Sequence, residues 1–438
     1  MVEYFLFAFI RVHSRFTSRL CITTLIASIL ILFGSCTMNR IDENGTTLQN
    51  DLFHTFYEEV AAADDPGMRN TLVDSFLSSL HENNYPILEN DTTAVLLYRN
   101  GNGRVSMISD LTDMADATPM EKIKGTDLYY IRLHAREDAR IEYFFVSDEQ
   151  QIPFPDPLNS YRVYYGVWTA SELAMPGYKR HPVFDPFLNG PKGSYDRVVG
   201  HTIEGNIMGY PHLIHVYHPP GYGESSERYP AVYFQDGSDY IESAYVPYIL
   251  DALIGDNTIE PVIGVFVTPP NRYQPEMPNR MTEYGMNDDY VSFFTEELVT
   301  YIDSEYRTKA DPYNRLVVGD SYGGLISLYI ALKRPDIFGA AYSQSGYVSF
   351  NDDRIIQLFE SRPVQPVRLY VDIGIYERNV GSQFLPSEET DFLEGNRRFR
   401  KVLEEKGYEF IYREHPEGHT WGNWRRHLVD VLINNFGN

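Results

Sequence analysis

The most constraining feature of the sequence is an apolar run at residues 316–318 that ends in the motif Gly-x-Ser-x-Gly at residues 319–323. The pattern predicts a buried strand, a sharp turn at Ser321 and a helix that continues through residues 325–333. The glycines allow a tight turn, and the start of the helix presents unpaired N–H groups and the positive end of its dipole beside the serine. These are the requirements of a nucleophile that forms an oxyanion, and the alternative is an ordinary strand-to-helix turn.

The N-terminal segment has the pattern of an export signal. Three arginines precede an apolar run at residues 20–33, and the sequence Phe-Gly-Ser-Cys at residues 33–36 resembles the lipobox of a bacterial lipoprotein. Cleavage at such a site leaves Cys36 as the acylated first residue. We therefore expect a signal peptide at residues 1–36, a polar linker at residues 37–50, and a membrane-anchored lipoprotein in the periplasm or at the cell surface of a bacterium. The alternative is a plain membrane anchor helix.

The composition argues against several classes of function. The chain has 61 acidic and 37 basic residues, which argues against a nucleic-acid partner because phosphate binding needs a basic face. Its only cysteines, Cys21 and Cys36, lie in the N-terminal segment, so the body has none for disulfides or thiol catalysis. His212, His215 and His218 share a predicted strand, where alternate side chains point to opposite faces and cannot converge on a metal. We therefore expect no metal site.

Hydrophobic periodicity divides the remaining chain into two parts. Residues 51–165 predict two helices followed by the short strands of a small sandwich, with a hairpin at the sequence Asn-Gly-Asn-Gly of residues 100–103. After a connector near residues 166–191, strands and helices alternate through residues 190–438, which predicts a mostly parallel sheet with helices on both faces. The predicted strands are residues 212–218, 231–235, 262–267, 316–318, 340–343, 367–372 and 409–412, and the main predicted helices are residues 289–306, 325–333 and 388–405.

Three candidate catalytic side chains follow the ends of predicted strands, where the functional groups of parallel sheets gather. Their order is Ser321, an acid, and His419. His419 lies between the last strand and the last helix and is suited to take the proton of Ser321, because a histidine pKa lies near neutral pH. Its alternative is a histidine of an ordinary surface loop. The acid is Glu377, in a loop, or Asp372, at the end of the preceding strand, and the reach of the loop favours Glu377.

The remaining candidates surround these three side chains. The backbone N–H groups of Tyr322, directly after the serine, and of Ser238, after the strand at residues 231–235, are the predicted oxyanion donors. Arg280, close to Glu283 in the sequence, is a candidate substrate-binding residue, although a surface ion pair is the simpler explanation. Trp421, beside His419, is the second candidate substrate-binding residue.

Four segments together resemble the esterase D / enterochelin esterase-like family of α/β-hydrolases. They are Tyr-Pro-Ala-Val-Tyr-Phe-Gln-Asp-Gly at residues 229–237, the serine motif, Ser-Gln-Ser-Gly at residues 343–346 and Gly-His-Thr-Trp at residues 418–421. The resemblance covers residues 194–436 and implies a serine carboxylic-ester hydrolase without a cofactor. The acid element of the family, Gly-x-x-Glu/Asp, falls on residues 374–377 and supports Glu377. Residues 93–159 resemble the immunoglobulin-like early-set domain that precedes such hydrolases.

The expected protein is thus an α/β-hydrolase with a mostly parallel central sheet, preceded by a small all-β immunoglobulin-like sandwich. The expected activity is hydrolysis of a siderophore-type or acylated-carbohydrate ester, acetyl or feruloyl, through Ser321, His419 and Glu377. Two alternatives stay open. One is an acyltransferase that uses the same site, and the other is a catalytically inactive lipoprotein that binds a carbohydrate or a siderophore.

Overall fold

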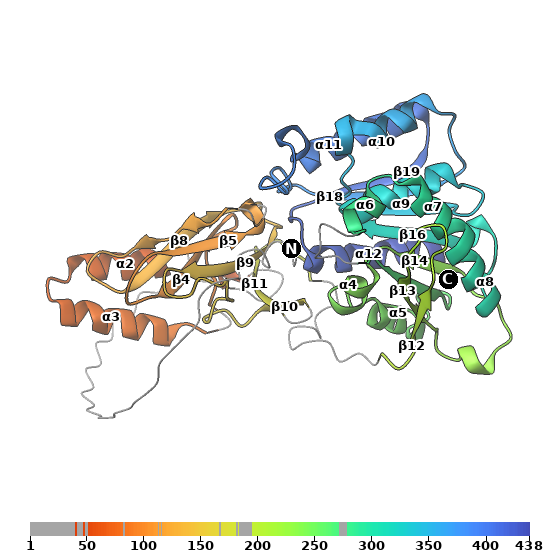
Figure 1. Cartoon of the computed structure of the whole chain (residues 1–438). Helices are drawn as coiled ribbons and strands as arrows, with labels where there is room; N and C mark the ends of the chain where they lie inside the picture. Colours follow the sequence, from red (N-terminus) through yellow and green to blue (C-terminus); the bar gives the residue numbers. More distant parts are fainter. Residues whose placement is uncertain are drawn as a thin grey trace.

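The structure, a computed structural model, describes residues 40–41, 47–48, 51–81, 84–112, 114, 116–165, 168–180, 183, 195–270 and 278–438. The predicted signal peptide with Cys36, and most of the predicted linker, lie outside these residues. No helix of the described part of the chain has both the length and the apolar character needed to cross a membrane. Figure 1 shows an N-terminal part and a larger C-terminal part, which meet near helix α12 (Trp421–Phe436).

The N-terminal part begins with the two predicted helices. They are α2 (Leu52–Ala62) and α3 (Pro66–Ser79), separated by a short turn. Asp65 caps α3, because its side chain accepts a hydrogen bond from the backbone N–H of Met68. Pro66 occupies the first helical position, where its missing N–H has no consequence. The turn chemistry of the sequence therefore explains where the first helix ends and the second begins.

Two antiparallel sheets complete this part, which we call the N-terminal sandwich. Their strand orders are β3-β4-β8-β7 and β10-β11-β9-β5-β6, and side chains of both sheets, such as Leu96 and Phe145, share one apolar core. The strands are β3 (Ile87–Asn90), β4 (Thr93–Arg99), β5 (Val105–Ser109), β6 (Thr118–Pro119), β7 (Glu121–Lys122), β8 (Leu128–His134), β9 (Arg140–Ser147), β10 (Arg162–Tyr165) and β11 (Trp168–Ala174), preceded by a two-stranded pair of β1 (Arg40–Ile41) and β2 (Thr47–Leu48).

Two predictions about the sandwich are wrong. Residues 100–103 do not close a hairpin, because β4 pairs with β3 and β8 whereas β5 pairs with β6 and β9. A connection between two sheets can use the same turn residues as a hairpin. The burial of each strand's apolar side chains decides which strand it pairs with. The predicted boundary at residue 165 is also too early, because β11 pairs with β9 and extends the sandwich to Ala174. The immunoglobulin-like class of the sandwich stays a prediction.

The C-terminal part is built on an eight-stranded sheet with the order β12-β13-β15-β14-β16-β17-β18-β19. The first two strands run antiparallel to their neighbours and the other six are parallel, which confirms the mostly parallel sheet. Only edge strand β12 was missed, because its side chains are largely exposed and form no apolar run. The strands are β12 (Val198–Ile203), β13 (His212–Tyr217), β14 (Ala231–Phe234), β15 (Ile263–Thr268), β16 (Arg315–Asp320), β17 (Ala340–Gln344), β18 (Arg368–Gly374) and β19 (Glu409–His415).

Helices cover both faces of this sheet. Side chains of β16 alternate between two apolar clusters, with Val317 facing α8, α9, α10 and α11 and with Leu316 and Val318 facing α4, α5 and α12. The predicted helix at residues 289–306 consists of α7, a π-helical segment (Phe293–Leu298) and α8. The remaining helices are α4 (Gly237–Glu242), α5 (Val246–Gly255), α6 (Arg280–Tyr284), α7 (Asp288–Ser292), α8 (Val299–Glu305), α9 (Tyr322–Lys333), α10 (Phe350–Ser361) and α11 (Phe392–Lys406).

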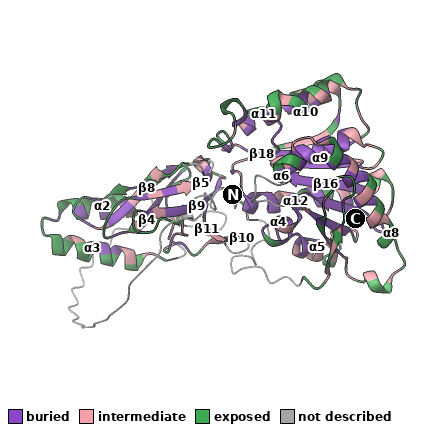
Figure 2. Ribbon diagram, in the orientation of Figure 1, coloured by how far each residue is buried: buried purple, intermediate pink, exposed green. Residues whose placement is uncertain are grey.

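The apolar core under α12 continues into the sandwich. Val163 and Tyr165 of β10 belong to the same buried cluster as Trp421 and Trp424 of α12. Figure 2 shows buried residues along α12, where the two parts meet. The contact between the sandwich and the C-terminal part is therefore a shared hydrophobic core, which resists separation more than a polar interface does.

The junction of β16 and α9 requires glycine at Gly319. A Cβ at this position would lie 2.2 Å from the carbonyl oxygen of Gly323, which is backbone and cannot move aside. We expect Gly319→Ala to lower the free energy of unfolding, measured by urea denaturation, by about 1–3 kcal/mol. Gly255→Ala is the control, because a Cβ at Gly255 meets no atom within 4 Å and alanine there is expected to be neutral or slightly stabilising. Equal effects of the two substitutions would contradict the packing argument.

Candidate active site

Ser321 lies at the turn between β16 and α9 with a backbone φ of 55° and ψ of −119°. A positive φ is uncommon for a residue with a side chain and persists only where the surroundings enforce it. The enforcing contacts are visible: Ser321 N–H donates to the carbonyl of Gln344 at 2.9 Å, and Ser321 carbonyl accepts from Tyr347 N–H at 3.0 Å. The half-buried hydroxyl group is thereby held beyond the carboxyl end of the sheet, as predicted.

Glu377 and His419 form a hydrogen-bonded pair. His419 Nδ1 lies 2.7 Å from Glu377 Oε2, and Glu377 Oε1 accepts from Ser345 Oγ at 2.6 Å and from Gly374 N–H at 2.8 Å. The glutamate side chain is fully buried, whereas the histidine side chain is 16% exposed. Because Nδ1 faces the carboxylate, the neutral imidazole carries its proton there and leaves Nε2 as a proton acceptor.

Asp372, the other candidate acid, points away from this pair. It accepts hydrogen bonds from the Tyr342 hydroxyl group and, at 3.3 Å, from Ser345 N–H. Burial, reinforced by the charge of Glu377, raises the pKa of Asp372 to about 8, so this carboxyl group is mostly protonated at neutral pH. A neutral carboxyl group does not stabilise a positively charged imidazolium. Of the two acids that the sequence left open, Glu377 is the partner of His419.

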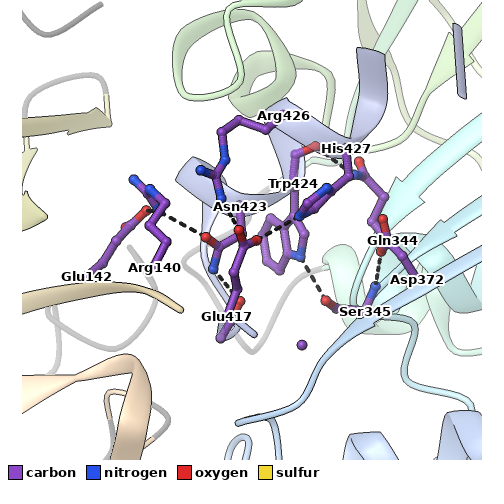
Figure 3. Close-up of polar contacts among 12 residues, drawn as sticks. Arg140, Glu142, Gln344, Ser345, Asp372, Glu417, Asn423, Trp424, Arg426 and His427 are labelled. Carbon is purple, nitrogen blue, oxygen red and sulfur yellow. Dashed lines mark hydrogen bonds and ion pairs between the residues drawn. The ribbon is translucent and has the colours of Figure 1, made fainter. Parts of the chain in front are cut away.

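Two aromatic rings fix the orientation of the imidazole. Phe392 and Trp424 meet the His419 ring edge to face, at centroid distances of 5.4 Å and 4.8 Å and interplanar angles of 89° and 88°. Trp424 Nε1 also donates to Ser345 Oγ at 2.9 Å, a bond drawn in Figure 3. Ser345 therefore joins the indole that packs on His419 to the carboxylate that binds it. The sequence at residues 343–346 carried only a family resemblance, and this role of Ser345 was missed.

A backbone hydrogen bond followed by two ring contacts connects Ser321 to His419. Tyr347, whose N–H binds the Ser321 carbonyl, stacks on Phe392 at 4.9 Å and 7°, and Phe392 in turn packs against His419. The elbow and the histidine thus lie at the same edge of the sheet. Within the described residues the Ser321 hydroxyl group makes no hydrogen bond to His419. Such bonds are often long without substrate and tighten when substrate binds.

The backbone donors near Ser321 differ from the prediction at one position. Tyr322 begins α9, and its N–H lies in the first helical turn, where no intrahelical carbonyl can reach it. Ser238 N–H, the other predicted donor, is already bound to Thr268 Oγ1 at 3.1 Å. The preceding N–H, that of Gly237 at the start of α4, has no acceptor among the described residues. The sequence could not show that the Thr268 hydroxyl group accepts from Ser238 N–H, because Thr268 lies on another strand.

Arg280 lies inside the protein and not on an open surface. Its guanidinium group forms two hydrogen bonds to Asp236, at 2.7 Å and 2.8 Å, and a third to the carbonyl oxygen of Asp320 at 3.1 Å. Asp236 adopts a left-handed backbone conformation with φ of 52°, directly before Gly237. Arg280 therefore connects the loop after β14 to the residue before Ser321. Its contact with substrate stays a prediction.

The side chains of Trp421 and Glu283 are also buried. Trp421 is buried and packs against Tyr240 and Trp424, so its indole is part of the core beneath α12 and not of a substrate surface. Glu283 accepts hydrogen bonds from His212 Nε2 at 2.7 Å and from the Tyr210 hydroxyl group. The described residues contain no group of three or more histidine, cysteine or acidic side chains placed to hold a metal ion.

Comparison with known proteins identifies an esterase family for the C-terminal part of the chain. A family model described as "Putative esterase" matches residues 205–434. The uncharacterized protein YjcH of Bacillus subtilis is 29% identical over 219 residues, which cover 50% of this chain and 88% of YjcH. An endo-1,4-beta-xylanase/feruloyl esterase of Xylanibacter ruminicola is 33% identical over 146 residues, which cover 28% of this chain and 18% of that enzyme.

A solved structure with the same fold extends over both parts of the chain. Ferric enterobactin esterase from Salmonella typhimurium aligns with a TM-score of 0.65 and 19% identity, over 78% of this chain and 93% of that protein. A likeness at this identity concerns the fold. The α/β-hydrolase fold expected from the sequence is thereby confirmed.

The raised pKa of Asp372 predicts how stability depends on pH. Between about pH 4 and pH 8 the folded chain keeps a proton on Asp372 that the unfolded chain releases, so this residue makes stability fall as pH rises. Asp372→Asn has no such proton, and the variant should gain stability relative to the native chain by up to about 1.4 kcal/mol per pH unit in that window. Urea unfolding at about pH 5 and about pH 8 measures the difference. A gap that is constant, or that shrinks toward high pH, would show that Asp372 is ionised in the folded protein.

Proposed function

The chain belongs to the esterase family whose model matches residues 205–434 and is a carboxylic ester hydrolase, and from that premise we propose that Ser321, His419 and Glu377 form its catalytic triad. The observation that carries the proposal is the 2.7 Å contact between Glu377 Oε2 and His419 Nδ1, at the sheet edge where the elbow holds Ser321. The three residues also occur in the chain order serine, acid, histidine that α/β-hydrolases use.

In the proposed mechanism, Ser321 Oγ attacks the ester carbonyl carbon while His419 Nε2 takes the hydroxyl proton. The Glu377 carboxylate stabilises the imidazolium that forms. His419 then returns the proton to the leaving alcohol, and an acyl-enzyme remains on Ser321. Water then reacts in the same way. It gives a proton to His419 and attacks the acyl carbon. The acid is released as the proton returns to Ser321.

The negative charge on the carbonyl oxygen needs donors that are already in place. We assign this role to the N–H groups of Tyr322 and Gly237, with Gly237 replacing Ser238. A Cβ at Gly237 would lie 2.4 Å from the carbonyl carbon of Phe266, so only glycine brings this N–H so close to β15. Arg280 supports the arrangement by tying Asp236 to Asp320, which holds the two donor segments in register.

For the substrate we propose an ester with an aromatic acyl group, of the feruloyl-saccharide or catecholate type. Tyr322, directly after the nucleophile, is half-buried and packs edge to face against Phe350 at 5.8 Å, and Phe350 is also half-buried. Rings placed there offer a planar acyl group a large apolar contact, which an acetyl group is too small to use. The relative from Xylanibacter ruminicola is named a feruloyl esterase, and the solved enzyme from Salmonella typhimurium is an enterobactin esterase.

The triad is tested by substituting the nucleophile and each of the two acids. We expect Ser321→Ala to lower kcat/KM for a soluble aryl ester by at least about 10³-fold, and Glu377→Gln to lower it by about 10²–10⁴-fold because the imidazolium loses its counter-charge. Asp372→Asn is the matched control and should change kcat/KM by less than about threefold, since Asp372 binds Tyr342 and not His419. Unchanged turnover in Ser321→Ala, together with undiminished labelling by a fluorophosphonate, would refute the triad.

The acyl preference is tested with matched substrates. Purified protein should hydrolyse feruloyl saccharides or a cyclic catecholate ester with a kcat/KM about tenfold or more above that for acetylated xylan, because ring contacts contribute roughly 0.5–1.5 kcal/mol each. Phe350→Ala should reduce this preference and leave acetyl ester turnover unchanged. An equal or greater rate on acetylated xylan would assign the site to small acyl groups.

A further inference from the structure

The N-terminal sandwich touches the loop that carries His419. We call residues 416–420, between β19 and α12, the histidine loop. Arg140 N–H, at the start of β9, donates to the carbonyl oxygen of Pro416 at 3.2 Å. A Cβ at Gly418 would lie 2.8 Å from the Cβ of Asp110, so the sandwich packs directly on the backbone beside His419. The loop that carries the proposed base is thus in contact with a different part of the protein.

The Arg140 side chain crosses from the sandwich to α12. It is 1% exposed, and its charge is balanced inside the sandwich by Glu172 at 2.6 Å and Glu142 at 2.5 Å. Its Nη1 also donates to Asn423 Oδ1 at 2.8 Å, as Figure 3 shows. A guanidinium group has five donors in a fixed plane, so binding both carboxylates also fixes where the donor to Asn423 points.

Asn423 passes this constraint to the histidine loop. Its Nδ2 donates to the carbonyl oxygen of Gly418 at 2.7 Å, and Gly418 directly precedes His419. Helix α12 and the sandwich pack tightly here, because a Cβ at Gly422 would lie 1.9 Å from Glu142 Oε1. Two hydrogen bonds in series therefore connect a buried arginine of the sandwich to the backbone of the proposed base.

The histidine loop is also held from the C-terminal part, at Glu417. Glu417 accepts hydrogen bonds from Arg426 and from His427 Nε2 on α12, and these bonds are drawn in Figure 3. Burial raises the pKa of Glu417 to about 7. This side chain anchors the loop to its own helix, whereas Arg140 and Asn423 anchor it to the sandwich.

The sandwich also contacts the turn that carries Glu377. The Tyr376 hydroxyl group accepts from the backbone N–H of Arg136 at 3.0 Å, and the Tyr376 ring packs on the apolar core of the sandwich. Tyr376 N–H donates to the carbonyl oxygen of Glu417 at 3.3 Å, and a Cβ at Gly374 would lie 2.3 Å from that oxygen. The turn that carries Glu377 and the histidine loop thus contact each other, and both contact the N-terminal sandwich.

We propose that the N-terminal sandwich is a required support of the active site, and that Arg140 and Asn423 are positioning residues that hold His419 against Glu377. The inference rests on the proposed function of His419 as the base. A tether or a separate carbohydrate-binding module has no need of contacts at the two loops that carry the acid and the base. The contacts of this sandwich reach both loops, at Pro416, Gly418 and Tyr376.

The first experiment compares two variants of the connection with one matched control, all in the full chain. Arg140→Lys keeps the charge but removes the planar set of donors, and Asn423→Ala cuts the connection while leaving the charges intact. We expect each to lower kcat for a small aryl ester by about 10-fold to 100-fold, with KM nearly unchanged, because a small misplacement of the base acts on chemistry and not on binding. Arg132→Lys is the matched control. Arg132 is a β8 arginine in an exposed pair with Glu89, and its substitution should change neither constant.

Two readouts separate positioning from a general loss of structure. The ring of His419 contacts Phe392, Trp424 and one charged group, Glu377. A ring that drifts from these partners lowers kcat with KM nearly unchanged. A general loss of structure would instead speed hydrogen exchange throughout the chain.

Hydrogen exchange measured by mass spectrometry tests the contact without relying on catalysis. Peptides covering residues 416–424 should exchange faster in Arg140→Lys and Asn423→Ala than in the native chain or in Arg132→Lys. Unchanged exchange in both variants would overturn the inference, even if activity were lower. Faster exchange, in a protein whose Ser321→Ala variant stays fully active, would uphold the support of the loop and refute the proposed triad alone. If Arg140→Lys does not fold, Asn423→Ala decides both measurements.

Discussion

The candidate active site depends on one buried carboxylate, that of Glu377, which has no access to water and must find all its hydrogen-bond donors within the protein. The donors come from three places: its own turn at Gly374, the loop after β17 at Ser345, and the loop after β19 at His419. These segments follow neighbouring strands of the sheet. Satisfying a single charge therefore requires three adjacent parallel strands to end at the same level, and the same requirement sets the position of the imidazole.

A second buried charge organises the nucleophile side in a similar way. Arg280 on α6 binds Asp236 after β14 and the carbonyl oxygen of Asp320 at the end of β16. Both segments are held in backbone conformations that residues with side chains seldom adopt, at Asp236 and at Ser321. Strain of this kind needs surrounding contacts that make relaxation costly, and a buried, bidentate ion pair is such a contact. The site is thus rigid on both sides of the proposed nucleophile.

The parts of this structure that the sequence predicted are those set by local chemistry. The elbow at Ser321 and the helix pair around Asp65 were correct because glycine spacing and helix capping act over a few residues. The choice between Glu377 and Asp372 required knowledge of where each side chain points. The hydrogen bond that occupies Ser238 N–H is accepted by Thr268, which lies on another strand. The predicted hairpin at residues 100–103 was wrong, because a hairpin and a connection between two sheets use the same turn residues. Arg140 lies in no motif, and its role follows only from which surfaces meet.

The bond between Arg140 and Asn423 joins residues that are 283 positions apart. Contacts of such separation form late, because the chain must first close a very long loop. During synthesis the sandwich emerges before α12 does. A nascent chain can thus hold a finished sandwich and a finished serine elbow while its histidine still lacks a fixed place. The ability to cleave an ester would then arise in one step, when α12 docks onto the sandwich that was synthesised before it.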